Sequence, residues 1–455
     1  MTIATINPST NKIIRKFETL RKDDVSNAIQ LADNAYQQWR KTSFALRKAC
    51  LEKFAELLRS DLDELARLIT LEMGKRFAES QYEIEYCATI AEYYAAGAEK
   101  FLADQRFDVD DATAYLRHEP IGVVLGVMPW NFPFYQVVRF AAPNIMAGNT
   151  VLMKHASIVP QCAIAIEKLF AECGLPTGVY TNLLIPTEFV ETILSDDRVQ
   201  GVSLTGSESA GAAVAAIAGK HLKRSVLELG GNDAFIVLED ADLEHAVQQA
   251  VKGRIVNAGQ SCVAAKRFIV DQAIADEFLS GFKKQMSELQ LGDPMDASTT
   301  LGPLSSEEAA ETVQKQVQSA IDAGATVVLG GDRSLREGAF FNPTILADVT
   351  SDMPTFDQEI FGPVATVYVA QDEAEAIRLA NNSSYGLGGS VFTRDVHRGR
   401  RVAEQIETGM MFINQPTKSQ ADLPFGGIKN SGYGRELSYL GILEFVNKKL
   451  IHLSN

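Results

Sequence analysis

The amino-acid sequence predicts an α/β protein built on mostly parallel sheets. From Pro120 onward, short apolar runs bounded by Gly, Pro or Asn alternate with segments of helical periodicity. This alternation is typical of right-handed βαβ units. The expected strands are 121–127, 151–153, 178–185, 199–204, 235–238, 268–270, 327–329, 365–369 and 389–392. Because they fall into two series on either side of Gly231, two α/β domains are the simplest partition.

The first hundred residues and the segments 104–118 and 445–453 have sequence patterns that differ from this alternation. From Asp23 to Trp39 apolar residues recur every three or four positions, which predicts an amphipathic helix, and further helices follow to about Ala103. The polar segment 104–118 contains Thr113-Ala114-Tyr115-Leu116, which predicts a β arm. Residues 445–453 are the expected partner strand.

Composition narrows the classes of partner. The chain has 455 residues and a net charge of −15, which repels phosphate backbones and anionic lipid, so neither nucleic acid nor membrane is an expected partner. Its five cysteines form no CxxC pair, which argues against a zinc ribbon or a disulfide framework, and no metal site is expected. With no signal-peptide pattern and no long apolar run, the expected location is the cytoplasm.

Several polar residues follow predicted strands, where α/β sheets bind ligands. Asn131 could donate an amide N–H to a developing negative charge, or could simply close a turn. Thr205-Gly206-Ser207 precedes a small-residue helix and predicts an anion site of general kind. Lys154 could face a ribose or phosphate, or could reach solvent.

Two further residues have the chemistry of covalent catalysis. Glu228 ends a strand before two glycines and could act as a general base if burial raises its pKa, although a solvent-facing carboxylate is the alternative. Cys262, in Gly259-Gln260-Ser261-Cys262, could be a nucleophile, although a lone cysteine is more often a small core residue. Glu359-Ile360-Phe361-Gly362-Pro363 taken alone reads as a loop with a buried Phe.

In their order along the chain these motifs closely resemble the aldehyde dehydrogenase superfamily. The matching segments are Pro129-Trp130-Asn131-Phe132-Pro133, Lys154, Thr205-Gly206-Ser207, Glu228-Leu229-Gly230-Gly231, Gly259-Gln260-Ser261-Cys262, Glu359-Ile360-Phe361-Gly362-Pro363 and Pro424-Phe425-Gly426-Gly427. The resemblance implies a Rossmann-like cofactor-binding domain, an α/β catalytic domain and an oligomerisation arm. We expect these at 1–103 with 121–230, at 231–424, and at 104–120 with 437–455, in a homodimer or homotetramer.

The resemblance also implies a mechanism. Cys262 would attack a small-molecule aldehyde, Asn131 would stabilise the oxyanion, and Glu228 would activate the water that hydrolyses the thioester. A catalytically silent structural or binding relative of the same fold is the alternative of a different class.

The cofactor is expected to be a nicotinamide dinucleotide. By resemblance, the residues that would bind it are Trp130, Lys154, Ser157, Gly206, Ser207, Glu359 and Phe361. Ser157 stands where NAD-preferring relatives often carry Glu, and its neutral side chain would not repel a 2′-phosphate. We therefore expect NADP to be preferred and NAD to be a second cofactor.

Two residues resemble positions that hold the distal carboxylate in succinate-semialdehyde dehydrogenases. These are Arg139 and Ser419, and an Arg fork with a hydroxyl suits a carboxylate. For Arg139 a salt bridge between elements is the alternative. Val256 replaces a second Arg of many such enzymes, which leaves another small aldehyde as an alternative substrate, and Ala264 replaces a cysteine that could form a regulatory disulfide.

Overall fold

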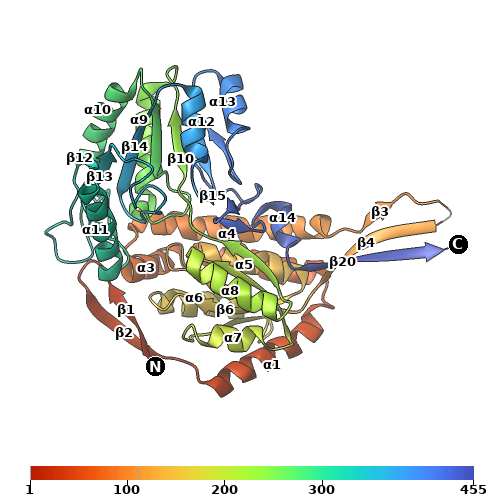
Figure 1. Cartoon of the computed structure of the whole chain (residues 1–455). Coiled ribbons are helices and arrows are strands. Elements are labelled where there is room, and N and C mark those ends of the chain that lie inside the picture. Colours follow the sequence, from red (N-terminus) through yellow and green to blue (C-terminus); the bar gives the residue numbers. More distant parts are fainter. Residues whose placement is uncertain (1, 111, 455) are drawn as a thin grey trace.

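The computed structural model describes residues 2–110 and 112–454, and two separate open sheets dominate it (Figure 1). One sheet has six strands in the order β19-β9-β8-β5-β6-β7, and the other has seven in the order β12-β13-β14-β11-β10-β16-β17. Helices cover both sheets, as expected for βαβ units. The predicted α/β class is therefore confirmed.

The six-stranded sheet is parallel except at one edge. Its strands are β5 (Val123–Met128), β6 (Thr150–His155), β7 (Tyr180–Asn182), β8 (Val199–Thr205), β9 (Arg224–Glu228) and β19 (Gly432–Tyr433). Strand β19 pairs antiparallel with β9, and the other neighbours are parallel. Because parallel strands end at the same edge, the loops after β5, β8 and β9 and the end of β6 meet there.

The seven-stranded sheet includes two strands that the sequence analysis did not predict. Its members are β10 (Ala234–Val237), β11 (Arg267–Asp271), β12 (Thr326–Leu329), β13 (Thr344–Ala347), β14 (Val364–Ala370), β16 (Gly389–Phe392) and β17 (Phe412–Ile413). Strands β13 and β17 have only four and two residues, too few to show a period. A small pair, β15 (Tyr385–Gly386) with β18 (Ile428–Lys429), lies apart from both sheets.

The helices follow the predicted periodicity and have local end signals. Their bounds are α1 Lys22–Trp39, α2 Phe44–Ser60, α3 Leu62–Met73, α4 Phe77–Phe101, α5 Tyr135–Ala147, α6 Pro160–Glu172, α7 Phe189–Leu194, α8 Glu208–Lys220, α9 Leu243–Ile255, the 3₁₀ turn η1 Val256–Gly259, α10 Ala275–Ser287, α11 Glu307–Asp322, α12 Glu373–Asn381, α13 Val396–Ala403 and α14 Ser438–Ile442. Ser43 caps α2 by accepting from the Leu46 N–H, and Gly148 at φ 100° ends α5.

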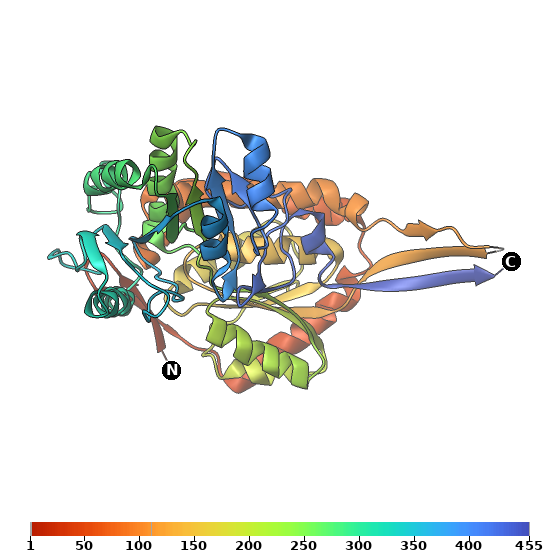
Figure 2. The ribbon, with the colours of Figure 1, turned by 45° about the horizontal axis from the view of Figure 1, so that its top comes forward.

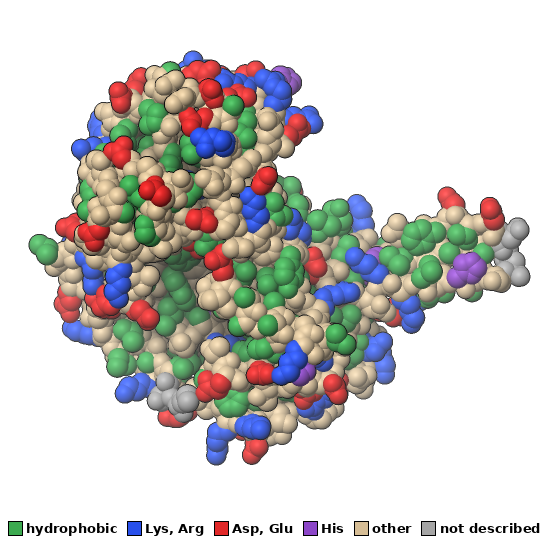
Figure 3. All heavy atoms as spheres, viewed as in Figure 1, with side chains coloured by type: hydrophobic (Ala, Val, Ile, Leu, Met, Phe, Trp, Pro, Cys, Tyr) green, Lys and Arg blue, Asp and Glu red, His purple; other side chains and the backbone are tan. Residues whose placement is uncertain are grey.

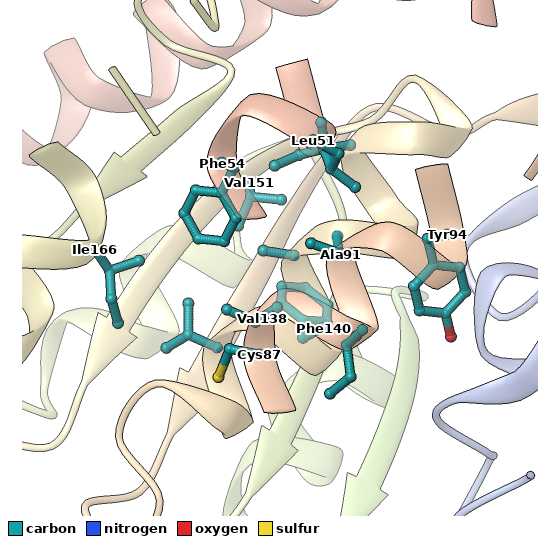
Figure 4. Close-up of a cluster of buried hydrophobic side chains, with 14 of the residues drawn as sticks. Leu51, Phe54, Cys87, Ala91, Tyr94, Val138, Phe140, Val151 and Ile166 are labelled. Carbon is teal, nitrogen blue, oxygen red and sulfur yellow. The ribbon is translucent and has the colours of Figure 1, made fainter. Parts of the chain in front are cut away.

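The largest buried cluster lies between the N-terminal helices and the six-stranded sheet (Figure 4). Phe54 of α2 stacks on Phe170 of α6 with ring centroids 4.1 Å apart, and Val138 and Phe140 of α5 lie beside Cys87 of α4. Packing of α4 against α5 matters for function because α5 begins just after Asn131.

An arm of three strands projects away from the body of the molecule (Figures 1 and 2). It consists of β3 (Gln105–Phe107), β4 (Ala112–Pro120) and β20 (Val446–Ser454), with β4 and β20 antiparallel from Ala112 opposite Ser454 to Pro120 opposite Val446. The predicted pairing of these two segments is present. A hairpin of β1 (Thr2–Asn7) and β2 (Lys12–Glu18) lies on the side of the molecule away from this arm (Figure 1). Within the described residues no helix is both long and apolar enough to cross a membrane.

Candidate active site

The carboxyl edge of the six-stranded sheet gathers most of the predicted residues. Asn131 follows β5, Gly206 follows β8, and Glu228 is the last residue of β9. The Gly206 N–H donates to the Glu228 backbone carbonyl at 3.0 Å, so these two strand ends are in direct contact. Ser207 caps α8 by accepting from the Ala210 N–H at 3.3 Å. An exposed hydroxyl and free N–H groups at a helix start form a setting that suits an anion.

A cavity of about 270 Å³ lies at this edge, and its walls suit a dinucleotide. It is lined by Pro129, Trp130, Asn131, Gln136, Thr205, Gly206, Ser207, Leu229, Gly230, Cys262, Glu359 and Phe361. The rings of Trp130 and Phe361 are nearly perpendicular, with centroids 5.9 Å apart. A Cβ at Gly230 would collide with the Glu359 carboxylate, so glycine is what permits that approach. We call this the cofactor cavity.

Two of the predicted cofactor residues lie outside the walls of that cavity. Lys154 is buried at the end of β6, where its Nζ donates to the His155 carbonyl at 3.3 Å and burial lowers its pKa. Ser157 is exposed three residues later. Both are on the carboxyl side of β6, one strand away from β5.

A second cavity, of about 260 Å³, opens on the other side of Cys262. Its lining is mostly aromatic and aliphatic and comes from α4, α5, η1 and nearby loops: Lys75, Ala78, Glu79, Tyr82, Glu83, Tyr86, Phe132, Tyr135, Gln136, Val256, Asn257, Ser261, Cys262, Val263, Ser419 and Phe425. Cys262 and Gln136 line both cavities. The thiol therefore stands where two ligand spaces meet, and we call the second space the aldehyde cavity.

The loop that carries Cys262 has an unusual backbone. Asn257 and Ala258 have φ of 51° and 54°, and Gly259 follows at 79°. A Cβ at Gly259 would collide with the Gly362 carbonyl. Two non-glycine residues in the left-handed region are strained, and such strain persists only where surrounding contacts hold it.

Asn131 is tied to this loop from the opposite side. Its Nδ2 donates to the Gln260 carbonyl at 3.2 Å, and the Asn257 Nδ2 donates to the Asn131 carbonyl at 2.8 Å. The Asn131 side chain is thus an amide donor bound to the carbonyl two residues before Cys262. Chemically it can stabilise an oxygen that becomes negative when the thiol attacks a carbonyl.

Burial governs the titration of both groups with catalytic potential. Burial raises the pKa of Cys262 to about 12, and the positive charges of Arg139 and Lys266 oppose that rise. Burial also raises the pKa of Glu228 well above its usual value, opposed mainly by Arg139. Glu228 is 2 % exposed, and among described residues its two oxygens have no hydrogen-bond partner. A buried carboxyl of raised pKa can take up a proton near neutral pH.

Comparison with known proteins decides the family. Residues 1–451 match the Aldehyde dehydrogenase family. The chain belongs to the aldehyde dehydrogenase family. It is therefore an oxidoreductase, and the predicted resemblance is confirmed.

Individual relatives in this family are similar over their full length. A protein of Deinococcus radiodurans named succinate-semialdehyde dehydrogenase [NADP(+)] is 52 % identical over 98 % of this chain and 94 % of its own. One of Mycobacterium tuberculosis, named succinate-semialdehyde dehydrogenase [NADP(+)] 1, is 48 % identical with full coverage of both chains. The crystal structure of succinic semialdehyde dehydrogenase from Streptococcus pyogenes in complex with NADP+ is 46 % identical, covers both chains fully and has a TM-score of 0.98.

The structure places Arg139 outside the lining of both cavities. Its guanidinium is 1 % exposed, forms an ion pair with Glu436, and donates to the Tyr135 hydroxyl at 3.0 Å and to Thr205 Oγ1 at 3.2 Å. It does not line the aldehyde cavity. These contacts match the alternative interpretation, a salt bridge between elements, because Arg139 belongs to α5 and Glu436 lies near the C-terminus. Ser419, in contrast, lines the aldehyde cavity, and its role as a substrate contact stays a prediction.

Two buried lysines near the site were missed by the sequence analysis. Lys75 pairs with Glu83 and donates to the Asn131 carbonyl at 2.8 Å, while Glu83 accepts from the backbone N–H groups of Phe134 and Tyr135. Lys266 contacts the Cys262 loop. The only sequence signal for Lys266 was that Lys266 and Arg267 are consecutive basic residues at the start of a buried strand. Within the described residues, no group of three or more His, Cys, Asp or Glu side chains could hold a metal ion.

Proposed function

We propose that this enzyme oxidises succinate semialdehyde to succinate with NADP+. The observation that carries the proposal is the position of Cys262 between two cavities, one suited to a dinucleotide and one to a small aldehyde. The names of the relatives that are 48–52 % identical support both the aldehyde and the cofactor. Ser157, exposed and neutral near Lys154, supports NADP+ because no carboxylate at that position repels a 2′-phosphate.

In the proposed mechanism Cys262 attacks the aldehyde carbon. A C–S bond forms, the carbonyl electron pair moves to oxygen, and the Asn131 amide with the Cys262 backbone N–H stabilises that oxyanion. Bound NADP+ supplies the acceptor for the hydride that leaves this carbon, which yields a thioester on Cys262. Glu228 then takes a proton from water, the water oxygen attacks the thioester carbon, and the C–S bond breaks to release the acid. Because burial raises the pKa of Cys262, the thiol gives up its proton to solvent as the C–S bond forms, and the thiolate released in the last step takes a proton back.

The cavity walls support residues for the nicotinamide and pyrophosphate parts of NADP+, and the family resemblance supports residues for its adenosine end. Glu359, with Trp130 and Phe361 beside it, would hold the nicotinamide riboside end, and Gly206 with Ser207 would hold the pyrophosphate at the start of α8. Lys154 and Ser157 would meet the adenosine ribose beyond the cavity.

A cluster of hydroxyls at the wall of the aldehyde cavity supports a carboxylated substrate. The Tyr135 hydroxyl accepts from Arg139, and the Ser419 side chain lies near the hydroxyls of both Tyr135 and Tyr86. The Tyr86 hydroxyl is buried and has no hydrogen bond of full geometry among described residues, although Ser419 partly offsets the rise that burial causes in its pKa. We infer that these hydroxyls receive the distal carboxylate and that Arg139 acts through Tyr135.

The test compares succinate semialdehyde with butanal, which has four carbons and no carboxylate. We expect Ser419→Ala and Tyr86→Phe each to lower kcat/KM for succinate semialdehyde about tenfold, the effect of one hydrogen bond to a charged group, and to leave butanal within about twofold. Tyr82→Phe is the matched control, because that phenol stacks on Tyr86 but is 71 % exposed. Equal losses for both aldehydes would point to another small aldehyde as substrate.

We further propose that the arm joins protomers into a homodimer or homotetramer. Apolar side chains are exposed along it, including Phe107, Leu450 and Leu453, as the green atoms of Figure 3 illustrate. Exposed apolar surface on a projecting sheet is typical of an interface. Light scattering of the wild type against Leu450→Lys tests this, and a wild-type monomer would refute it.

The cysteines support the expected cytoplasmic location. All five, at 50, 87, 162, 173 and 262, are free thiols. Free thiols persist in a reducing compartment.

A further inference from the structure

Lys266 is a buried lysine whose ammonium contacts the backbone around the nucleophile. It lies just before β11 with its side chain 3 % exposed, and its Nζ donates to the carbonyl oxygens of Ser261 at 3.0 Å, Cys262 at 2.8 Å and Ala264 at 3.2 Å. Burying an ammonium is costly unless its three donors are satisfied. Here three acceptors of this ammonium are carbonyl oxygens of the turn that presents Cys262.

The same ammonium is also paired with a carboxylate of the cofactor cavity. Its Nζ lies 3.1 Å from Glu359 Oε1, and Glu359 lines that cavity beside Phe361. Glu359 Oε1 also accepts from the Gly231 N–H at 3.1 Å. One buried cation therefore joins the carboxylate that faces the cofactor to the carbonyl of the nucleophile itself.

The turn before Cys262 needs such support. Asn257 and Ala258 lie in the left-handed region, which is strained for residues with a Cβ and persists only where surrounding contacts hold it. Arg254 donates to the Gly259 carbonyl at 2.7 Å and holds the turn at its start. Lys266 holds the segment on the C-terminal side of Cys262, four residues further along the chain.

Four charged groups set the potential at the thiol. Arg139 from α5 and Lys266 lower the pKa of Cys262, while Glu359 and Asp233 raise it. The Asp233 backbone carbonyl accepts from the Lys266 backbone N–H at 3.1 Å, and its carboxylate accepts from the Gly388 N–H at 3.1 Å. Lys266 is thus the one cation of this group that also touches the loop.

We propose that Lys266 is a positioning residue that couples the occupancy of Glu359 by the cofactor to the geometry and charge at Cys262. The proposal rests on the roles proposed above for Cys262 and Glu359. A ligand hydroxyl that binds Glu359 would use the same carboxylate that pairs with Lys266. A displacement of the Lys266 ammonium would then change its hydrogen bonds to the three carbonyls of the turn that carries Cys262. Coupling of this kind is reciprocal, so the state of Cys262 also affects cofactor affinity.

The test measures the alkylation rate of Cys262 by iodoacetamide, without NADP+ and at saturating NADP+, together with the Kd for NADP+. Lys266→Met is compared with the wild type and with Lys252→Met, an exposed lysine on α9. Cys262→Ser provides the background from the four buried cysteines. We expect Lys266→Met to lower the cofactor-free alkylation rate about tenfold at pH 8, because loss of one nearby cation raises the thiol pKa by about one unit.

The decisive quantity is the ratio of alkylation rates with and without NADP+. We expect this ratio to differ between the wild type and Lys266→Met by about fivefold or more, and to be unchanged in Lys252→Met. Glu359→Gln breaks the link at its other end while keeping the three carbonyl contacts, so it provides the same test if Lys266→Met does not fold. Glu359→Gln should lose the effect of NADP+ on the alkylation rate of Cys262. The variant with both substitutions should show the same ratio of rates as the single variants.

The outcomes separate this proposal from the mechanism. Wild-type ratios in both Lys266→Met and Glu359→Gln would overturn the coupling and leave the nucleophile untouched. Full turnover by Cys262→Ser would instead overturn the mechanism on which the coupling rests.

Discussion

The two cavities that meet at Cys262 are built in different ways. The cofactor cavity lies at the ends of parallel strands, and its walls come from the short loops after β5, β8 and β9. The aldehyde cavity lies beside helices, and seven of its sixteen lining residues are side chains of α4 and of the start of α5, while the others come from η1 and from loops. Loops at strand ends are contiguous motifs, so the first cavity is readable in the sequence. The second is assembled from residues that are several positions apart.

Replacing Cys262, one of the two residues that line both cavities, should have the largest effect. We expect Cys262→Ala to reduce turnover by roughly 10⁴-fold or more, because the covalent path is lost. The Kd for NADP+ should change by less than about threefold, since the walls of the cofactor cavity stay intact. Turnover is followed by NADPH absorbance, and affinity by fluorescence titration. Activity within tenfold of the wild type would remove Cys262 from the mechanism.

The next largest effect is expected at Glu228, the last residue of β9, at the sheet edge that carries the cofactor cavity. Glu228→Gln should slow steady-state turnover about 10³-fold, while one equivalent of NADPH still forms in a burst because the acyl-enzyme accumulates. In the wild type, hydrolysis should increase as pH rises through the raised Glu228 pKa, since only the carboxylate accepts a proton from water. Stopped-flow absorbance over pH measures both. A missing burst would assign Glu228 to an earlier step.

Asn131 belongs to the boundary between the cavities. Removal of its amide in Asn131→Ala should lower kcat about 10²-fold, the typical loss for one oxyanion donor, with a smaller change in KM. Its backbone carbonyl still receives Lys75 and Asn257, so the loop is expected to keep its fold. Circular dichroism serves as the structural control, and an effect on KM alone would contradict the oxyanion role.

The smallest effect is expected at the far end of the cofactor. Ser157→Glu should shift the ratio of kcat/KM for NADP+ over NAD+ about tenfold toward NAD+, because a carboxylate repels the 2′-phosphate. The KM for succinate semialdehyde should stay constant, which separates the two cavities experimentally. Ser157→Ala is the neutral control. An unchanged preference for NADP+ over NAD+ would mean that residue 157 does not recognise the 2′-phosphate.

The accuracy of the sequence analysis follows the same division. Trp130, Asn131, Gly206, Ser207, Glu359 and Phe361, all in strand-end loops or local motifs, come together in one cavity. Tyr86 and Tyr135 of the aldehyde cavity were missed, because an aromatic residue at helical spacing looks the same whether it faces the core or a ligand. Their roles, and the domain boundaries at 103, 120, 230, 424 and 437, remain predictions.

The order of strands and helices, the acidic balance and the motifs around Cys262 are local properties, and the chain alone determines them. Ion-pair partners are not local. Arg139 pairs with Glu436 across nearly three hundred residues, and Lys266 reaches Glu359 from another part of the second sheet. A charged side chain in a sequence is most simply assigned to solvent, because burial requires a partner that only folding supplies. The tertiary structure therefore decided which charges are buried, and it placed Arg139 in a buried ion pair with Glu436.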